Sequence, residues 1–233
     1  MMITENSKNI SIALMAYNEG ANIAAVVSDL KESLGRIDGT HEIIIINDGS
    51  SDNTKEIAEK LSEEFKIVRT VNHTPNMGLG AVYRTGFKEA KGDYLTFWPA
   101  DGQFDTDIIK DFTSQTDKCD LVLGYLPNRK RGVIGSTLSF GEKTLYRILF
   151  GKMPKFQGVL MLKTSMLKDI NLISEGRGWA VLIEFIIKAK KQNYKIKSIP
   201  TDLSKRASGK SKVTNIKTVI SNLSQIIELK FKI

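Results

Sequence analysis

The chain has 233 residues, of which 41% are hydrophobic and 26% charged, so its length and composition suit one large globular domain. A single cysteine, Cys119, excludes an intramolecular disulfide and fits a reducing compartment. No apolar run approaches the roughly 18 residues that span a bilayer, and the polar residues 1–9 are unlike a signal peptide. We therefore expect a cytoplasmic protein.

The net charge of +8 is unevenly distributed along the chain. Residues 1–117 hold 11 Lys/Arg and 19 Asp/Glu, a net charge of −8, whereas residues 118–233 hold 23 and 7, a net charge of +16. A basic half suggests phosphates, an anionic membrane surface or nucleic acid as partner, and a solvated lysine-rich surface is the alternative. Nucleic acid is not expected, because the sequence has no recognisable binding motif or aromatic stacking pattern.

The first hundred residues predict alternating strands and helices from their hydrophobic periodicity. Strands are expected at 10–15, 42–46, 67–71 and 94–98, and helices at 22–34, 54–65 and from the loop at 76–81 to residue 90. Three strand–helix units that feed a fourth strand predict an α/β fold with a mostly parallel central sheet flanked by helices.

The second half of the chain is less regular. It predicts helices at 108–112, 138–150 and 180–189, strands at 120–124, 159–162 and 194–199, basic loops at 126–136 and 205–212, and an amphipathic helix at 216–229. The basic loop 205–212 and the final helix are both candidates for contact with phosphate or with an anionic surface.

The apolar run from Tyr94 to Trp98 has no polar side and ends at Asp101, Gly102 and Gln103. In an open α/β sheet, ligands bind at the carboxyl ends of the strands. Asp101 and Gln103 are one residue apart, so both side chains can point the same way and offer oxygen to Mg²⁺ or Mn²⁺. An ordinary solvated turn is the alternative interpretation.

Two glycines, Gly78 and Gly80, precede a predicted helix and would let the backbone approach a ligand. This spacing is not the dinucleotide-binding fingerprint, and alone it is a weak signal. His41 and His73 lack the spacing of metal ligands.

Several short motifs occur together in one order. They are Ala16–Glu19, Asn47–Thr54, Gly78–Ala81 with Arg84–Phe87, Gly92–Tyr94, Ala100–Gln103 and Arg206–Ser211. With them the chain resembles the family 2 glycosyltransferases of GT-A fold, and within that family the dolichol-phosphate mannose synthase and polyprenyl-phosphate glycosyltransferase branch. The resemblance covers roughly residues 10–212. It implies a single GT-A (Rossmann-like) domain at 1–212, followed by the C-terminal amphipathic helix at 213–233.

The resemblance also implies roles for individual residues. Asp101 and Arg206 would be catalytic, and Asp101 and Gln103 would hold Mg²⁺ or Mn²⁺ on the diphosphate of a UDP- or GDP-sugar. The residues implied to bind this nucleotide-sugar are Ala16, Tyr17, Asn18, Glu19, Asp48, Gly80, Arg84, Ala100, Asp101, Arg206, Lys210 and Ser211. The implied activity is inverting transfer of the sugar to an acceptor, for this branch a polyprenyl phosphate.

Some positions depart from the family pattern. Pro99 and Asn47 stand where the family has acidic residues, and Gln157 stands where an aspartate usually precedes Gly158. Glu184 is the nearest candidate for a general base, although a helical carboxylate is more often structural, and a phosphate acceptor needs no base. A nucleotide-sugar-binding module with weakened or no catalysis, and a transferase acting on a glycan hydroxyl, are the alternative functions.

The predicted helix at 216–229 carries one apolar stripe behind a basic loop. The stripe could lie on an anionic membrane as a peripheral contact, form a homodimer interface, or pack on the protein's own core.

Overall fold

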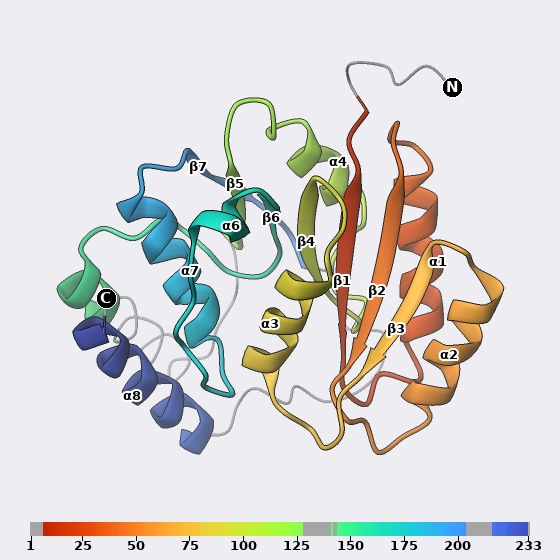
Figure 1. Ribbon diagram of the computed structural model, residues 1–233, viewed down its shortest axis with the longest axis horizontal. Helices are drawn as coiled ribbons and strands as arrows, with labels where there is room; N and C mark the ends of the chain where they lie inside the picture. The colour runs from red at the N-terminus through yellow and green to blue at the C-terminus, as the bar shows by residue number, and fades with distance from the viewer. Residues whose placement is uncertain (1–6, 128–140, 142–143, 204–215, 233) are drawn as a thin grey trace.

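The computed structural model describes residues 7–127, 141, 144–203 and 216–232, and for residues 216–222 it describes only the backbone. Figure 1 shows one sheet with helices on both faces. Its strand order is β3-β2-β1-β4-β6-β5-β7. The strands are β1 Ile10–Ala16, β2 His41–Asn47, β3 Val68–Asn72, β4 Tyr94–Pro99, β5 Leu121–Tyr125, β6 Leu160–Lys163 and β7 Ile196–Pro200. The helices are α1 Ile23–Leu34, α2 Thr54–Glu64, α3 Leu79–Glu89, α4 Ile108–Thr113, α6 Met166–Asp169, α7 Ala180–Lys191 and α8 Ile216–Lys232.

The sheet is mostly parallel, as the sequence predicted. Strand β1 pairs in parallel with β2 and with β4, β2 pairs in parallel with β3, and β5 with β7. Strand β6 is the exception, because it runs antiparallel to both of its neighbours, β4 and β5. Neither this direction nor the short helix α6 was expected from the sequence. The described residues 144–150 are helical within the predicted helix 138–150.

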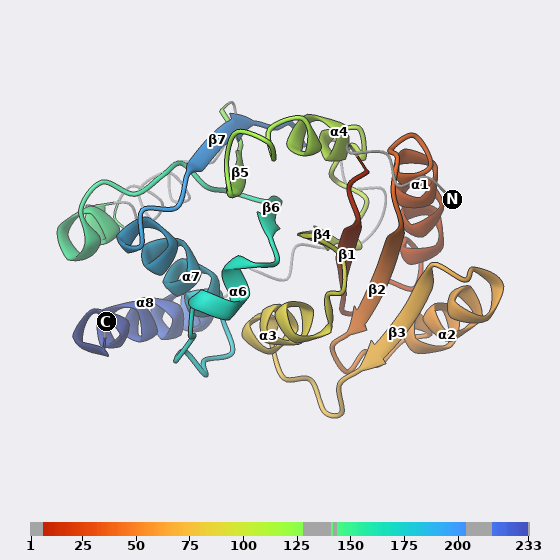
Figure 2. The same cartoon turned by 45° about the horizontal axis from the view of Figure 1, so that its top comes forward.

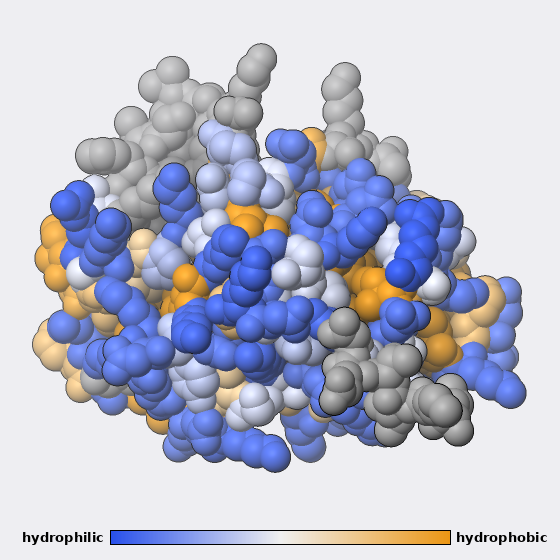
Figure 3. Space-filling view, turned by 90° about the horizontal axis from the view of Figure 1, so that it is seen from above, coloured by the Kyte–Doolittle hydropathy of each residue, from blue (hydrophilic) through white to orange (hydrophobic). Residues whose placement is uncertain are grey.

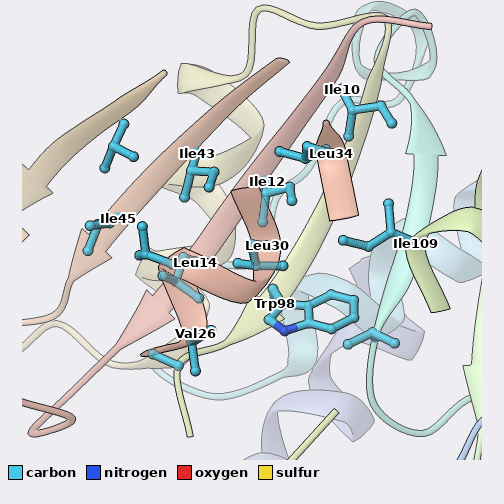
Figure 4. Close-up of a cluster of buried hydrophobic side chains, with 14 of the residues drawn as sticks. Ile10, Ile12, Leu14, Val26, Leu30, Leu34, Ile43, Ile45, Trp98 and Ile109 are labelled. Atoms are coloured by element: carbon cyan, nitrogen blue, oxygen red, sulfur yellow. The ribbon is translucent and has the colours of Figure 1, made fainter. Parts of the chain in front are cut away.

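Two hydrophobic layers cover the sheet, one on each face. On one face α1 lays Val26, Leu30 and Leu34 against Ile12 of β1, and Trp98 of β4 joins the same cluster (Figure 4). On the other face, side chains of α3 and α7 pack against alternate residues of the same strands. Figure 2 shows α3, α6 and α7 on one side of the sheet and α1 and α2 on the other.

The edge of the sheet where β1, β2 and β4 begin is covered mainly by hydrophilic side chains (Figure 3). Arg69 pairs there with Glu42 at 3.0 Å, and Lys163 pairs with Asp120 at 2.9 Å. In each pair a basic side chain is neutralised by an acidic one. The loops that follow β1, β2 and β4, which carry most of the candidate site residues, lie at the opposite edge of the sheet, where these strands end.

Helix α8 packs on α7. Ile226 and Leu229 are buried, and they form a small cluster with Ala180, Ile183 and Ile187. Ile226 and Leu229 therefore pack on the protein's own core, one of the three expected arrangements, whereas Ile227 of the same stripe is 43% exposed. Across the described part of the chain, no helix combines the length and apolar character needed to cross a bilayer.

Candidate functional site

The carboxyl ends of three neighbouring strands are joined by backbone hydrogen bonds. The N–H of Asp48, just after β2, donates to the carbonyl of Ala16 at 2.9 Å, and the N–H of Ala100, just after β4, donates to that of Met15 at 3.0 Å. The segments that follow β1, β2 and β4 therefore meet at one edge of the sheet, the lower edge in Figure 1. The sequence placed most of its candidate residues on these segments.

The segment after β1 is fastened to the segment after β2. Asn18 has a positive φ of 53°, its N–H donates to Ser50 Oγ at 2.9 Å, and its Oδ1 accepts from the N–H of Ser51 at 2.8 Å. The N–H of Glu19 donates to Thr54 Oγ1 at 2.8 Å. An asparagine tolerates this left-handed conformation better than most residues, so Asn18 suits the turn that holds the two loops together.

Within this segment, Tyr17 differs from its neighbours because 39% of it is exposed, whereas Glu19 is buried. The carboxylate of Glu19 accepts from Asn22 Nδ2 at 2.8 Å. The structure thus presents a partly exposed tyrosine, whose ring type can stack on a planar ligand, on a loop that Asn18 and Glu19 hold in place.

Asp52 supports the same loop from the β2 side. Burial opposes its ionisation, but hydrogen bonds from the side chain and backbone of Thr54 and from the N–H of Gly20 outweigh this and lower the pKa of Asp52. Asp52 is therefore an anion that anchors two loops.

Asp48 is buried, and four donors surround its carboxylate. Oδ1 accepts from His73 Nδ1 at 2.8 Å and from the N–H of Met77 at 2.9 Å. Oδ2 accepts from Asn76 Nδ2 and from the N–H of Gly78, both at 2.8 Å. All four donors belong to the segment between β3 and α3. Asp48 therefore fixes that segment to the end of β2, and its role as a nucleoside ligand stays a prediction.

The glycines of the segment before α3 allow protein segments to approach one another. Gly78 has a φ of +86°. A Cβ on Gly80 would lie 2.0 Å from the carbonyl oxygen of Gly176, so only glycine fits at that contact. The expected ligand at Gly80 stays a prediction, whereas the close approach of the segment at 173–178 was not expected.

Arg84 on α3 faces that same segment. Its Nη1 donates to the carbonyls of Ser174 at 3.1 Å and Gly176 at 3.3 Å. Its predicted contact with the nucleotide-sugar is therefore additional to a structural role, and it stays a prediction. Arg206, Lys210 and Ser211 lie outside the described residues.

Asp101 and Gln103 lie in the turn that follows β4. The N–H of Gln103 donates to Asp101 Oδ1 at 3.2 Å, and Gly102 between them has a φ of +69°. Phe104 continues from this turn into the core, where its ring meets that of Trp98 edge to face at 6.0 Å. The turn is thus half-buried, and the packing of Phe104 against Trp98 anchors it to the core.

The side chains of this turn suit Mg²⁺ or Mn²⁺, provided that most of the cation's ligands are not protein side chains. One carboxylate and one carboxamide offer oxygen, and Pro99 can add only its carbonyl. The described residues contain no cluster of three or more His, Cys, Asp or Glu side chains that could hold a metal by themselves. A cation here would therefore take its remaining ligands from water and from phosphate oxygens.

Glu184 on α7 is fully buried and belongs to the structure of the 173–178 segment. It accepts from the N–H groups of Ile173 and Ser174, each at 2.8 Å, and from Lys188 Nζ at 2.6 Å. Burial disfavours its ionised form, but the bonds from Lys188, Ser174 and Ile173 outweigh burial and lower the pKa of Glu184. The structural interpretation of this helical carboxylate is confirmed.

Three residues of this edge received no role from the sequence. His73 lacked metal-ligand spacing, Asn76 stood only beside the glycine motif, and Arg177 carried no local signal at all. The structure links them. Arg177 Nη2 donates to the carbonyl of Asn76 at 2.9 Å and to its Oδ1 at 2.7 Å, and Asn76 and His73 both donate to the carboxylate of Asp48.

The chain matches known proteins over most of its length. The family described as "Glycosyl transferase family 2" matches residues 11–163. A dolichol-phosphate mannosyltransferase of Pyrococcus furiosus is 27% identical over 94% of this chain, which spans 63% of that protein's length. A dolichyl-phosphate beta-glucosyltransferase of Trichomonas vaginalis is 24% identical over 93% of this chain and 72% of its own.

Solved structures of glucosyl-3-phosphoglycerate synthase from Mycobacterium tuberculosis share the fold. The complex with Mn²⁺, UDP and glucosyl-3-phosphoglycerate has a TM-score of 0.69 at 18% identity, over 94% of this chain and 77% of its own. The complex with Mg²⁺ and UDP has a TM-score of 0.68 at 16% identity, over 94% and 79%. The chain belongs to glycosyl transferase family 2 and has the GT-A fold, as its motifs predicted.

Proposed function

We propose that the chain is an inverting, metal-dependent glycosyltransferase that moves a sugar from a nucleotide-sugar to a polyprenyl phosphate. The observation that carries the proposal is the meeting, at one sheet edge, of the Tyr17 loop, the Asp48 cluster and the Asp101–Gln103 turn in a member of family 2. The names of the two sequence relatives, both acting on dolichol or dolichyl phosphate, support this acceptor class.

Each part of this edge has a task in the proposed reaction. The exposed ring of Tyr17 stacks on the base, and Asp48 keeps the segment before α3 in the shape that faces the nucleoside. Asp101 and Gln103 hold the divalent cation. When bound, the cation would neutralise charge on the departing nucleoside diphosphate.

Protonation chemistry supports a phosphate as the acceptor. A phosphate oxygen of the acceptor attacks the anomeric carbon from the face opposite the diphosphate. A bond forms between this oxygen and the anomeric carbon as the bond from that carbon to the diphosphate oxygen breaks. The electron pair of the broken bond leaves with the nucleoside diphosphate. A hydroxyl acceptor would need a base to take its proton, but Glu184, the candidate base, is buried and bonded to Ile173, Ser174 and Lys188. An anionic phosphate needs none.

Transfer assays test the proposal directly. UDP-, GDP- and dTDP-sugars are first screened by thermal shift with and without Mn²⁺, since a bound donor raises the melting temperature by mass action. The best donor is then offered with polyprenyl phosphate or with a glycan that has only hydroxyl acceptors. We expect Mn²⁺-dependent transfer to the phosphate. Donor binding without transfer to either acceptor would indicate a nucleotide-sugar-binding module. This is the second candidate function, because Pro99 stands where the family has an acidic residue.

A lipid-phosphate acceptor has to be met at a bilayer surface, and we propose that the C-terminal region makes this contact. Three large apolar side chains are exposed there: Phe231 at 85%, Ile148 at 75% and Ile227 at 43%. They lie on α8 and on the helical residues 144–150, whose Leu149 and Phe150 join the same cluster as α8. Exposed Arg147 and Lys230 lie on the same two helical segments and suit an anionic surface, whereas Lys232 pairs with Glu228 Oε1 at 2.6 Å.

Co-sedimentation with vesicles that contain phosphatidylserine tests this contact. Ile148→Glu with Phe231→Glu should remove binding, because both side chains are exposed and neither change disturbs the buried Ile226 and Leu229. Lys60→Glu on α2 is the control, because it lowers the net charge by as much as the double variant but at a distant exposed position. It should bind the vesicles as the wild type does, apart from a small general weakening. If the double variant instead abolishes a dimer seen by light scattering, the surface joins two copies and the membrane proposal fails.

A further inference from the structure

The segment 173–178, which leads into α7, is held firmly although it contains two glycines and no secondary structure. Its start is bonded to the carboxylate of Glu184, and two of its carbonyls accept from Arg84. The N–H of Gly80 donates to the carbonyl of Arg177 at 2.9 Å. The segment therefore connects α7 with the beginning of α3.

A chain of hydrogen bonds runs from this segment to the end of β2. Arg177 Nη2 donates to the carbonyl and to the Oδ1 of Asn76, and Asn76 Nδ2 donates to the carbonyl of Asp48 at 2.7 Å and to its Oδ2 at 2.8 Å. The amide of Asn76 is thus used on both sides, its oxygen by Arg177 and its nitrogen by Asp48. Moving Arg177 would remove the bond that orients this amide.

The same segment is in close contact with α8 on its other side. A Cβ on Gly176 would lie 1.8 Å from Gln225 Oε1, so this glycine and the amide end of the Gln225 side chain of α8 meet without room for one methyl group. Gly176 and Arg177 are adjacent. The Gln225 side chain of α8 therefore lies directly beside the residue that holds Asn76.

We propose that α8 acts as a strut for the nucleotide-binding edge, with Gln225 positioning the 173–178 segment and Arg177 positioning Asn76 and Asp48. The inference rests on the proposed binding of a nucleotide-sugar at this edge. It assigns α8 an effect on donor affinity although no candidate site residue lies on that helix. Because coupling between sites is reciprocal, donor binding also stabilises the seat of α8 on the segment.

The first test adds the missing methyl group. Gly176→Ala places a methyl group where the Gln225 amide lies, so this amide loses its seat against the segment, and the φ of Gly176 lies outside the left-handed region that alanine disfavours. Calorimetric titration uses whichever of UDP, GDP and dTDP binds the wild-type chain best, with Mn²⁺ present. We expect affinity to fall about tenfold, within the range of couplings between separate sites. Adding Gln225→Ala makes room for the methyl group and should restore affinity to within about twofold of wild type.

The control and the second variant separate the explanations. Gly141→Ala places a methyl group where nothing lies within 4 Å and should not change affinity. Arg177→Ala leaves the contact with α8 and removes the bonds to Asn76, so it should weaken binding similarly. Combined with Gly176→Ala, it should cost little more than either change alone, because both act through one path.

The outcomes are distinguishable from a failure of the proposed function. If the wild type binds none of the three nucleotides, the proposed function fails. If the wild type binds but Gly176→Ala binds equally well, or Gln225→Ala does not rescue it, α8 is no strut. Unchanged binding by Arg177→Ala would likewise overturn the path through Asn76, and this variant decides the matter if Gly176→Ala does not fold.

Discussion

The imidazole of His73 lies between Asp48 and α3, with Nδ1 2.8 Å from Asp48 Oδ1 and Nε2 2.8 Å from Thr85 Oγ1. Asp48 accepts only, so Nδ1 carries a proton and donates to it. Both ring nitrogens are used, and the side chain is buried. The ring thus links the end of β2 to the first turns of α3 across the candidate site.

Replacing His73 should affect both stability and ligand binding. His73→Phe keeps a ring but leaves the buried Asp48 and the half-buried Thr85 each without one partner, which costs about 1–3 kcal/mol of unfolding free energy. We also expect weaker binding of nucleoside diphosphate, measured by calorimetry beside urea unfolding. His41→Phe is the matched control. His41 lies at the start of β2 and bonds Ile37, so this change can alter stability but should leave ligand affinity as it was.

Asp101 is expected to be indispensable for Mn²⁺-dependent transfer. Asp101→Ala should reduce turnover more than about 100-fold, beyond the 10–100-fold loss typical of residues that merely support a metal ligand. Its circular dichroism spectrum and melting temperature should stay near those of the wild type. Asp105→Asn, in the same loop, serves as the control and should remain active. Wild-type turnover by Asp101→Ala would remove Asp101 from the metal site.

The buried Glu184 predicts a specific loss of stability in acid. Its pKa in the folded protein lies below the ordinary 4.5, since hydrogen bonds to the carboxylate outweigh burial. Its ionised form therefore contributes stability that is complete above the unfolded pKa and is lost as pH falls through the folded pKa. The difference in urea unfolding free energy between wild type and Glu184→Gln should be largest near pH 7 and shrink below about pH 4.5. Glu63→Gln, exposed on α2, should give a difference that is nearly independent of pH.

Gly86 on α3 should resist even a small enlargement. In an exposed helix, alanine would be better than glycine by about 1 kcal/mol. At Gly86, however, a Cβ would lie 2.3 Å from Phe97 Cε1, and the rings of Tyr83 and Phe87 lie edge to face with Phe97. Overpacking costs about 1–3 kcal/mol, so we expect net destabilisation in urea unfolding. Gly35→Ala at the end of α1 meets only ordinary contacts and should be neutral or stabilising.

Much of the first half of the fold could be read from the sequence because its signals are local. The isoleucine run at 43–46 and the apolar run at 94–98 each identify a buried strand, and the helices between them have clear periodicity. The direction of β6 is not a local property. Its run Leu160–Lys163 looks the same in either direction, and only pairing with β4 decides it.

The candidate site divides in the same way. The motifs placed Tyr17, Asp48 and Asp101 on the correct edge of the sheet, because strand ends can be located from sequence. The partners of Asp48 could not be assigned, since a hydrogen bond from His73 or a link from Arg177, 101 positions after Asn76, leaves no periodic trace. What Asp48 contacts inside the protein therefore emerged only from the structure.

The position of β6 also sets the order in which the chain can assemble. Strand β5 is made before β6, yet it lies beyond β6 in the sheet, so it cannot close the outer edge of β4. That edge stays without its neighbour from the synthesis of Pro99 until Leu160 emerges, about 3–12 s at roughly 5–20 residues per second. The unpaired N–H and C=O groups of an open strand edge can form hydrogen bonds with another chain and so cause aggregation. The centre of the sheet, its most apolar part, is therefore where a growing chain most needs protection on the ribosome.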